Sequence, residues 1–111
     1  MTDAHDIARD QRQLVQMRTL IADFRRGRNP IGPTIDNLSW LLSELTYAPD
    51  EWEERFIHHW GDLEIPYALA LDAGTPLPTA SDYEIAQALD SLDALIDEQS
   101  QRSQPLDGLD P

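Results

Sequence analysis

Two adjacent histidines in the segment RFIHHWGDLE, residues 55–64, are the strongest candidates for chemistry in the chain. On a helix, His58 lies four residues after Glu54 and four before Asp62, so the three side chains would share one outward stripe. Carboxylate oxygens and imidazole nitrogens at this spacing are ligands for zinc and other divalent ions. A second helix would have to supply a further ligand, so a solvated or partner-facing stripe is the preferred interpretation.

Other catalytic arrangements find little support in the sequence. The chain has no cysteine, and its serines lack the context of a nucleophile elbow. It contains neither a phosphate-binding loop nor a dinucleotide fingerprint. Carboxylates are so numerous that their presence alone does not identify an acid–base pair. We therefore expect no enzymatic activity, no metal and no cofactor, with a metal-dependent helical enzyme using His58 and Glu54 as the alternative.

Charge is the strongest compositional feature. The 111 residues include 21 acids and 8 bases, for a net charge of -13, and every base is an arginine. Residues 1–28 hold six arginines and four aspartates, whereas residues 29–111 hold two arginines and seventeen acids. Nucleic-acid binding needs a basic footprint, which the larger segment lacks. The charge favours a basic protein partner, with solubility as the alternative explanation.

The sequence also predicts a compartment. The first residues, MTDAHDIARDQRQ, are polar and acidic, unlike a secretory signal peptide. No apolar run approaches the roughly 20 residues that a membrane span requires. The lack of cysteine fits a reducing environment. We expect a cytoplasmic protein that does not contact membranes.

The elements that would position these residues are helices, because a 3.6-residue apolar periodicity recurs four times and no strand-like alternation is sustained. We expect helices over residues 6–26, 35–47, 51–73 and 82–98, with Gly27 and Gly74 as C-terminal stops. The expected N-caps are Thr34, Asp50 and Ser81, the last two within capping boxes completed by Glu53 and Glu84.

Pro66 lies inside the third expected helix, where its ring predicts a kink or a new start. The sequence therefore predicts one all-α domain over residues 1–98, a compact antiparallel bundle of four helices, or five if Pro66 breaks the third. The polar, Pro- and Gly-containing residues 99–111 are expected to be disordered.

An aromatic pair on the second helix is a candidate for partner binding. Trp40 and Tyr47 lie seven residues apart and roughly opposite the leucine seam of that helix. Exposed Trp and Tyr side chains often anchor protein interfaces, which favours a partner-binding role. The alternative is that both rings belong to the core.

Acidic stripes are the remaining candidates. The expected third helix presents Glu51, Glu54, His58 and Asp62, and the expected fourth helix presents Asp90, Asp93 and Asp97. Like charges at i+3 and i+4 cost about 0.2–0.5 kcal/mol per pair, so tolerating several of them favours a functional negative surface. The alternative is a solvated face without a partner.

The segment LIADFRRGRNPIGPTIDNLSWLLSEL, followed by EWEERFIHHWGDLEIPYALALDAG, resembles small helical immunity proteins of bacteria, of the colicin and contact-dependent-inhibition types. The resemblance covers residues 14–98 and rests on the apolar pattern and on WGDLE at 60–64, while Pro30, Pro33 and Pro66 depart from it. It implies a stoichiometric inhibitor that binds a cognate toxin, often a nuclease, and it carries over no catalytic residues.

The leading hypothesis is an acidic immunity-type protein whose negative face meets the basic active-site region of a nuclease-like toxin. The acidic and aromatic candidates above would all face the partner, with Trp40 and Tyr47 as anchors. An alternative from another class is a helical adaptor or regulatory subunit, which could form a homodimer through the Trp40 and Tyr47 face.

Overall fold

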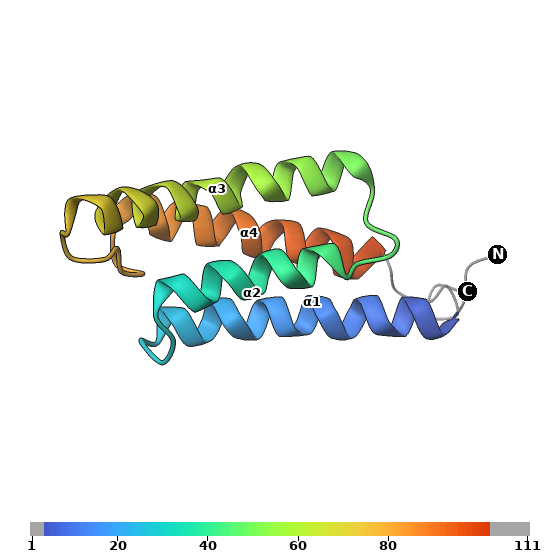
Figure 1. Cartoon of the computed structure of the whole chain (residues 1–111). Coiled ribbons are helices and arrows are strands. Elements are labelled where there is room, and N and C mark those ends of the chain that lie inside the picture. Colours follow the sequence, from blue (N-terminus) through green and yellow to red (C-terminus); the bar gives the residue numbers. More distant parts are fainter. Residues whose placement is uncertain (1–3, 103–111) are drawn as a thin grey trace.

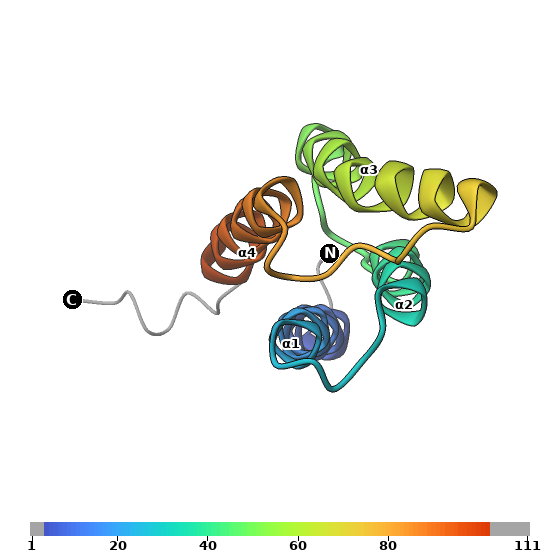
Figure 2. The same ribbon diagram turned by 90° about the vertical axis from the view of Figure 1, so that its left-hand side faces the viewer.

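The computed structural model describes residues 4–102 and folds them into four helices, with no strand in that range (Figure 1). The helices are α1 (Ala4–Arg25), α2 (Ile31–Ser43), α3 (Asp50–Ala73) and α4 (Tyr83–Arg102). Each helix packs against the next one in the chain, and α4 returns to pack against α1. Viewed along the bundle, α1 lies diagonally opposite α3 (Figure 2). The expected all-α antiparallel bundle is confirmed.

The core is built from the apolar seams that the periodicity predicts. Leu14, Met17 and Ile21 of α1 are at most 1% exposed, and they meet equally buried residues of the other three helices. Burial of a Leu, Ile or Met side chain stabilises the fold by roughly 1.5–3 kcal/mol. The positive φ of Gly27 and Gly74 ends α1 and α3 where the sequence predicts stops.

α2 differs from its expected bounds at both ends. It begins at Ile31, because Pro30 takes the N-cap position with an extended backbone and Pro33 lies in the first turn, where no N–H is needed. Thr34 is therefore not the N-cap; its buried hydroxyl donates to the Pro30 carbonyl at 2.9 Å. α2 ends at Ser43, so Tyr47 lies in the connection to α3.

α3 runs without a break through Pro66, so the bundle has four helices over residues 4–102 and the five-helix alternative is wrong. The N-cap of α3 is Pro49, and no side-chain hydrogen bond caps it, so the capping box expected at Asp50 does not form. The aromatic side chains of α3 instead fix its place in the bundle.

Two tryptophans of α3 reach the helices on either side of it. Trp52 Nε1 donates to the carbonyl of Leu95 on α4 at 2.7 Å, and Trp60 Nε1 donates to the carbonyl of Ile35 on α2 at 2.9 Å. Both indoles thus place their apolar bodies against the core while satisfying their N–H groups. The two bonds fix the orientation of α3 about its own axis and therefore determine which of its residues face outward.

α4 also departs from its expected bounds. It begins at Tyr83, and the Ser81 hydroxyl pairs with the Thr79 hydroxyl at 2.9 Å instead of forming the expected capping box. It extends to Arg102, because Gln99 is buried and Gln11 of α1 donates to the Ser100 carbonyl at 2.9 Å. Residues 99–102, expected to be disordered, are therefore helical; the rest of the expected tail, 103–111, lies outside the described residues.

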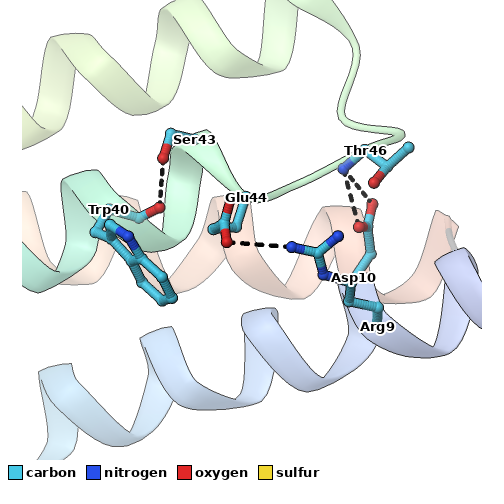
Figure 3. Close-up of polar contacts among 6 residues, drawn as sticks. All are labelled: Arg9, Asp10, Trp40, Ser43, Glu44 and Thr46. Carbon is cyan, nitrogen blue, oxygen red and sulfur yellow. Dashed lines mark hydrogen bonds and ion pairs between the residues drawn. The ribbon is translucent and has the colours of Figure 1, made fainter.

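A buried carboxylate joins α1 to the connection between α2 and α3. Asp10 is 1% exposed and accepts hydrogen bonds from the backbone N–H of Thr46 at 2.9 and 3.1 Å (Figure 3). It also accepts one from the backbone N–H of Tyr47 at 2.9 Å. These bonds satisfy amides just after the end of α2 and hold the connection against α1. Asp10 lies on the apolar face of α1, three residues after Ile7 and four before Leu14, so the helical period places it toward the core in spite of its charge.

Candidate functional site

The structure distributes the nine predicted partner-binding residues over four separate places on the surface. Those of the third helix share the outer face of α3, and the three aspartates lie along the border of α4 with α1. Trp40 lies over the border of α2 with α1, and Tyr47 lies near the start of α1. Because α1 and α3 are diagonally opposite, the α3 face and the Trp40 surface do not form one continuous site (Figure 2).

The outer face of α3 carries several exposed acids that form no ion pair with an arginine. Glu51, Glu54, His58 and Asp62 are all exposed, as the sequence predicts. Within residues 4–102, neither Glu51 nor Glu54 has an ion-pair partner, and Asp62 pairs only with a histidine. Arg55 is the single arginine of α3, and it forms an ion pair with Glu98 of α4 at 3.2 Å.

The same outer face changes character toward the C-terminal end of α3. Ile65 and Leu69 follow Asp62 at helical steps of three and four, and they are 56% and 64% exposed. The face therefore consists of an acidic half followed by an apolar half. Acids in the first turn also interact favourably with the helix dipole, which accounts for Asp50, Glu51 and Glu53 but not for Asp62, more than two turns further on.

The aspartates of α4 are paired within the chain. Arg25 of α1 contacts Asp90 at 2.9 Å and Asp93 at 3.4 Å, and Arg18 contacts Asp97. This acidic stripe points outward as expected, yet two arginines of α1 compensate most of its charge. The expected free stripe is thus a row of ion pairs between antiparallel helices.

Asp93 is the most enclosed of these three carboxylates. Partial burial raises its pKa above the ordinary value, and the negative charges of Asp97 and Asp90 act in the same direction. The positive charges of Arg25 and Arg18 oppose the shift without cancelling it. Its place at the seam with α1 suits packing between the helices better than contact with a partner.

Trp40 is a surface residue, and its expected pairing with Tyr47 is not found. Its side chain is 58% exposed and extends from α2 over α1 (Figure 3). It borders a hollow of about 340 Å³, lined also by Gln16, Thr19, Leu20, Asn37 and Leu41. Tyr47 is 36% exposed, and its hydroxyl lies 3.4 Å from a carboxylate oxygen of Asp6. The two rings lie apart because α2 ends four residues before Tyr47.

The two histidines and Asp62 form one compact group, whereas the sequence predicts a stripe of Glu54, His58 and Asp62. Ligand atoms of His58, His59 and Asp62 all lie within 4.8 Å of one another, and Nδ1 of His59 is 3.7 Å from Asp62. The centroids of the two imidazole rings lie 5.1 Å apart, in an edge-to-face arrangement. His59 therefore replaces Glu54 in the predicted donor set. Its i, i+3 relation to Asp62 is the sequence signal that would have revealed it.

A hollow of about 430 Å³, the α3–α4 hollow, lies between α3 and α4 beside this group. The α3 side contributes His59, Asp62, Ile65 and Pro66, and the α4 side contributes Glu84, Gln87, Ala88 and Ser91. The sequence did not predict this site, because the facing positions of two helices depend on their packing register. Its two carboxylates, Asp62 and Glu84, belong to different helices.

Comparison of the chain with protein-family models, with curated proteins and with solved structures finds no match. None of the four described helices combines the length and the apolar character needed to cross a bilayer. The outer face of α3 combines exposed carboxylates that have no arginine partner with exposed apolar side chains.

Proposed function

We propose that this chain is an acidic helical binding protein, an immunity protein that neutralises a cognate basic, nuclease-like bacterial toxin in the cytoplasm. The observation that carries the proposal is the outer face of α3, where Glu51, Glu54 and Asp62 are exposed without arginine partners. Elsewhere in residues 4–102, arginines pair with Glu44, Asp23, Asp90, Asp93, Asp97 and Glu98. Exposed carboxylates without an arginine partner are therefore a feature of the α3 face, whereas the aspartates of α4 that face α1 are compensated.

The mechanism follows from charge and exposure. Uncompensated carboxylates attract a basic surface during diffusion and raise the association rate more than the final affinity. A nuclease active site carries bases that bind substrate phosphates, so an acidic helix seated there occludes the path of the phosphates. Ile65 and Leu69, which continue the α3 face, supply apolar area that excludes water next to the charged contacts.

Affinity capture with the full chain tests this proposal. The chain is immobilised and exposed to extract of the source cell at low and at moderate salt, and retained proteins are identified by mass spectrometry. We expect one basic, nuclease-like protein at 1:1 stoichiometry, retained less at moderate salt because screening weakens exposed charge contacts. Co-expression of the chain should then rescue cells from that protein's toxicity. Retention of acidic or neutral proteins alone would contradict the proposal.

The second candidate is a helical adaptor or regulatory subunit that forms a homodimer, and it rests on Trp40. An indole that is 58% exposed beside a hollow is a feature of interface anchors. Sedimentation equilibrium of the chain and of Trp40→Ala discriminates the two candidates. A dimer that dissociates on this substitution favours the adaptor, whereas a monomer over the whole concentration range favours the immunity protein.

A further inference from the structure

The α3–α4 hollow adjoins the acidic half of the α3 face, and its lining is chemically divided. Carboxylates enter from both sides, Asp62 from α3 and Glu84 from α4. Both side chains are exposed, so they can reorient toward a guest without the loss of a buried contact. The hollow therefore offers negative charge from two directions.

His59, whose Nδ1 lies 3.7 Å from Asp62, also borders the hollow, and neutral acceptors and apolar surface complete the lining. Gln87 donates its amide N–H to the Tyr83 hydroxyl at 2.7 Å, and its carbonyl oxygen is an acceptor; Ser91 adds a hydroxyl. Ile65, Pro66 and Ala88 provide the apolar part. A guest that matches this lining carries a cationic head on an aliphatic stem.

We propose that the α3–α4 hollow receives an arginine side chain of the protein partner. Its guanidinium lies between the carboxylates of Asp62 and Glu84, and its methylene stem packs on Ile65 and Pro66. This inference rests on the proposed function and deepens it, because it names the chemical group of the partner that α3 recognises and the place where that group binds.

Arginine fits this lining better than lysine does. The guanidinium is planar and has five N–H donors, so it can serve two carboxylates and a neutral acceptor at once. The lysine ammonium is a compact, strongly hydrated charge that loses more by entering a partly apolar hollow. Glu54 and His58 are also exposed on the adjoining α3 face.

The test is an NMR titration of the full, ¹⁵N-labelled chain with N-acetyl-arginine amide. N-acetyl-citrulline amide is the control ligand, because it has nearly the same shape but a neutral head. We expect saturable shifts confined to the amides around Asp62, Ile65, Glu84 and Gln87 with arginine, and no saturation with citrulline. Lysine amide should bind more weakly than arginine amide at the same sites.

Substitutions of single carboxylates test which of them contribute to the binding of arginine amide. We expect Asp62→Asn and Glu84→Gln each to weaken arginine-amide binding by about fivefold, the effect of losing one partly exposed charge contact. Asp72→Asn removes the same charge from α3 at an exposed position that does not line the hollow, so it should leave binding within twofold. Equal responses to arginine and citrulline, or equal losses for Asp72→Asn and Asp62→Asn, would overturn the proposal.

This titration needs no partner protein, so its failure is separable from failure of the proposed function. A chain that captures a basic toxin but ignores arginine amide refutes only the arginine hollow. Selective arginine binding by a chain that captures no basic protein supports the hollow and refutes the immunity function.

Discussion

The guanidinium of Arg25 lies 2.9 Å from the carboxylate of Asp90, an acid that follows it by 65 residues in the chain. Arg18, seven residues earlier on α1, meets Asp97, seven residues later on α4, as antiparallel packing requires. The basic first helix and the acidic last helix thus compensate each other. What remains of the strong negative charge is concentrated on α3, and this is the basis of the proposed function.

Removal of Arg25 should affect stability only modestly. Exposed ion pairs contribute about 0.2–1 kcal/mol each, so Arg25→Gln should lower the free energy of unfolding by about 1 kcal/mol, and by less at high salt. Urea denaturation at two salt concentrations measures this difference. Arg26→Gln is the matched control, because Arg26 is exposed and has no ion pair within residues 4–102. Equal effects of the two variants would show that the Arg25 pairs contribute nothing.

Asp93 should make a pH-dependent contribution that differs from that of an ordinary salt-bridged aspartate. Burial raises its pKa in the folded chain, so the folded state holds this proton more tightly than the unfolded state does. Its contribution to stability is therefore full below the unfolded pKa of about 3.9 and is lost as the pH rises through the raised, folded pKa.

The neutral variant Asp93→Asn isolates this effect. It should be at least as stable as the original chain at pH 7, and its advantage should shrink as the pH falls toward 3.5. Thermal or urea unfolding of both chains from pH 3.5 to 7.5 gives the difference. A variant that is clearly less stable at pH 7 would mean that the contact with Arg25, at 3.4 Å, outweighs the burial of the carboxylate.

Gly32 should be intolerant of alanine because α3 lies against it. A Cβ at this position would come within 2.6 Å of the Tyr67 hydroxyl and 3.0 Å of the ring carbon that bears it. We expect Gly32→Ala to destabilise the fold by about 1–3 kcal/mol through overpacking. The loss should largely vanish in a Tyr67→Leu background, which a double-mutant cycle measures.

Gly61 provides the contrast for that experiment. It lies inside α3, and a Cβ there would meet nothing within 4 Å. Gly61→Ala should therefore stabilise the chain by about 0.5–1 kcal/mol through helix propensity alone. Equal effects of the two alanines would contradict the close contact between Gly32 and Tyr67.

Asp10 should be among the polar residues most sensitive to substitution. Asp10→Ala leaves the N–H groups of Thr46 and Tyr47 without their acceptor, which costs about 1–3 kcal/mol for buried groups. The matched control is Asp6→Ala, one helical turn away, whose side chain makes a long 3.4 Å contact with the Tyr47 hydroxyl. Chemical denaturation should show a several-fold larger loss for Asp10→Ala, and equal losses would contradict this role.

The fold was predictable because apolar periodicity reports directly on burial. Leu14, Met17 and Ile21 are core residues both by pattern and by structure. Helix ends were harder, because Thr34 and Asp50 have good capping chemistry while Pro30 and Pro49 take the cap positions. Proline fixes φ at the helix start, and here that preference prevailed over a side-chain cap.

The site was predictable only in part, since contacts between helices depend on packing. The outward stripe of α3 follows from the spacing of Glu54, His58 and Asp62 on one helix. The pairing of Asp97 with Arg18 does not, because it requires the register of α4 against α1. For the same reason the α3–α4 hollow, which depends on the register of α4 against α3, could not be predicted from the spacing of residues in the sequence.

The most direct test of the account compares two double variants in binding to the captured basic partner. Glu51→Gln with Glu54→Gln removes two unpaired carboxylates from α3, and Asp90→Asn with Asp97→Asn removes two arginine-paired carboxylates from α4. Both changes alter the net charge equally. If the α3 carboxylates steer the basic partner, the α3 variant should lose at least about tenfold in association rate, while the α4 variant should stay within about threefold. Equal losses in the two variants would contradict it.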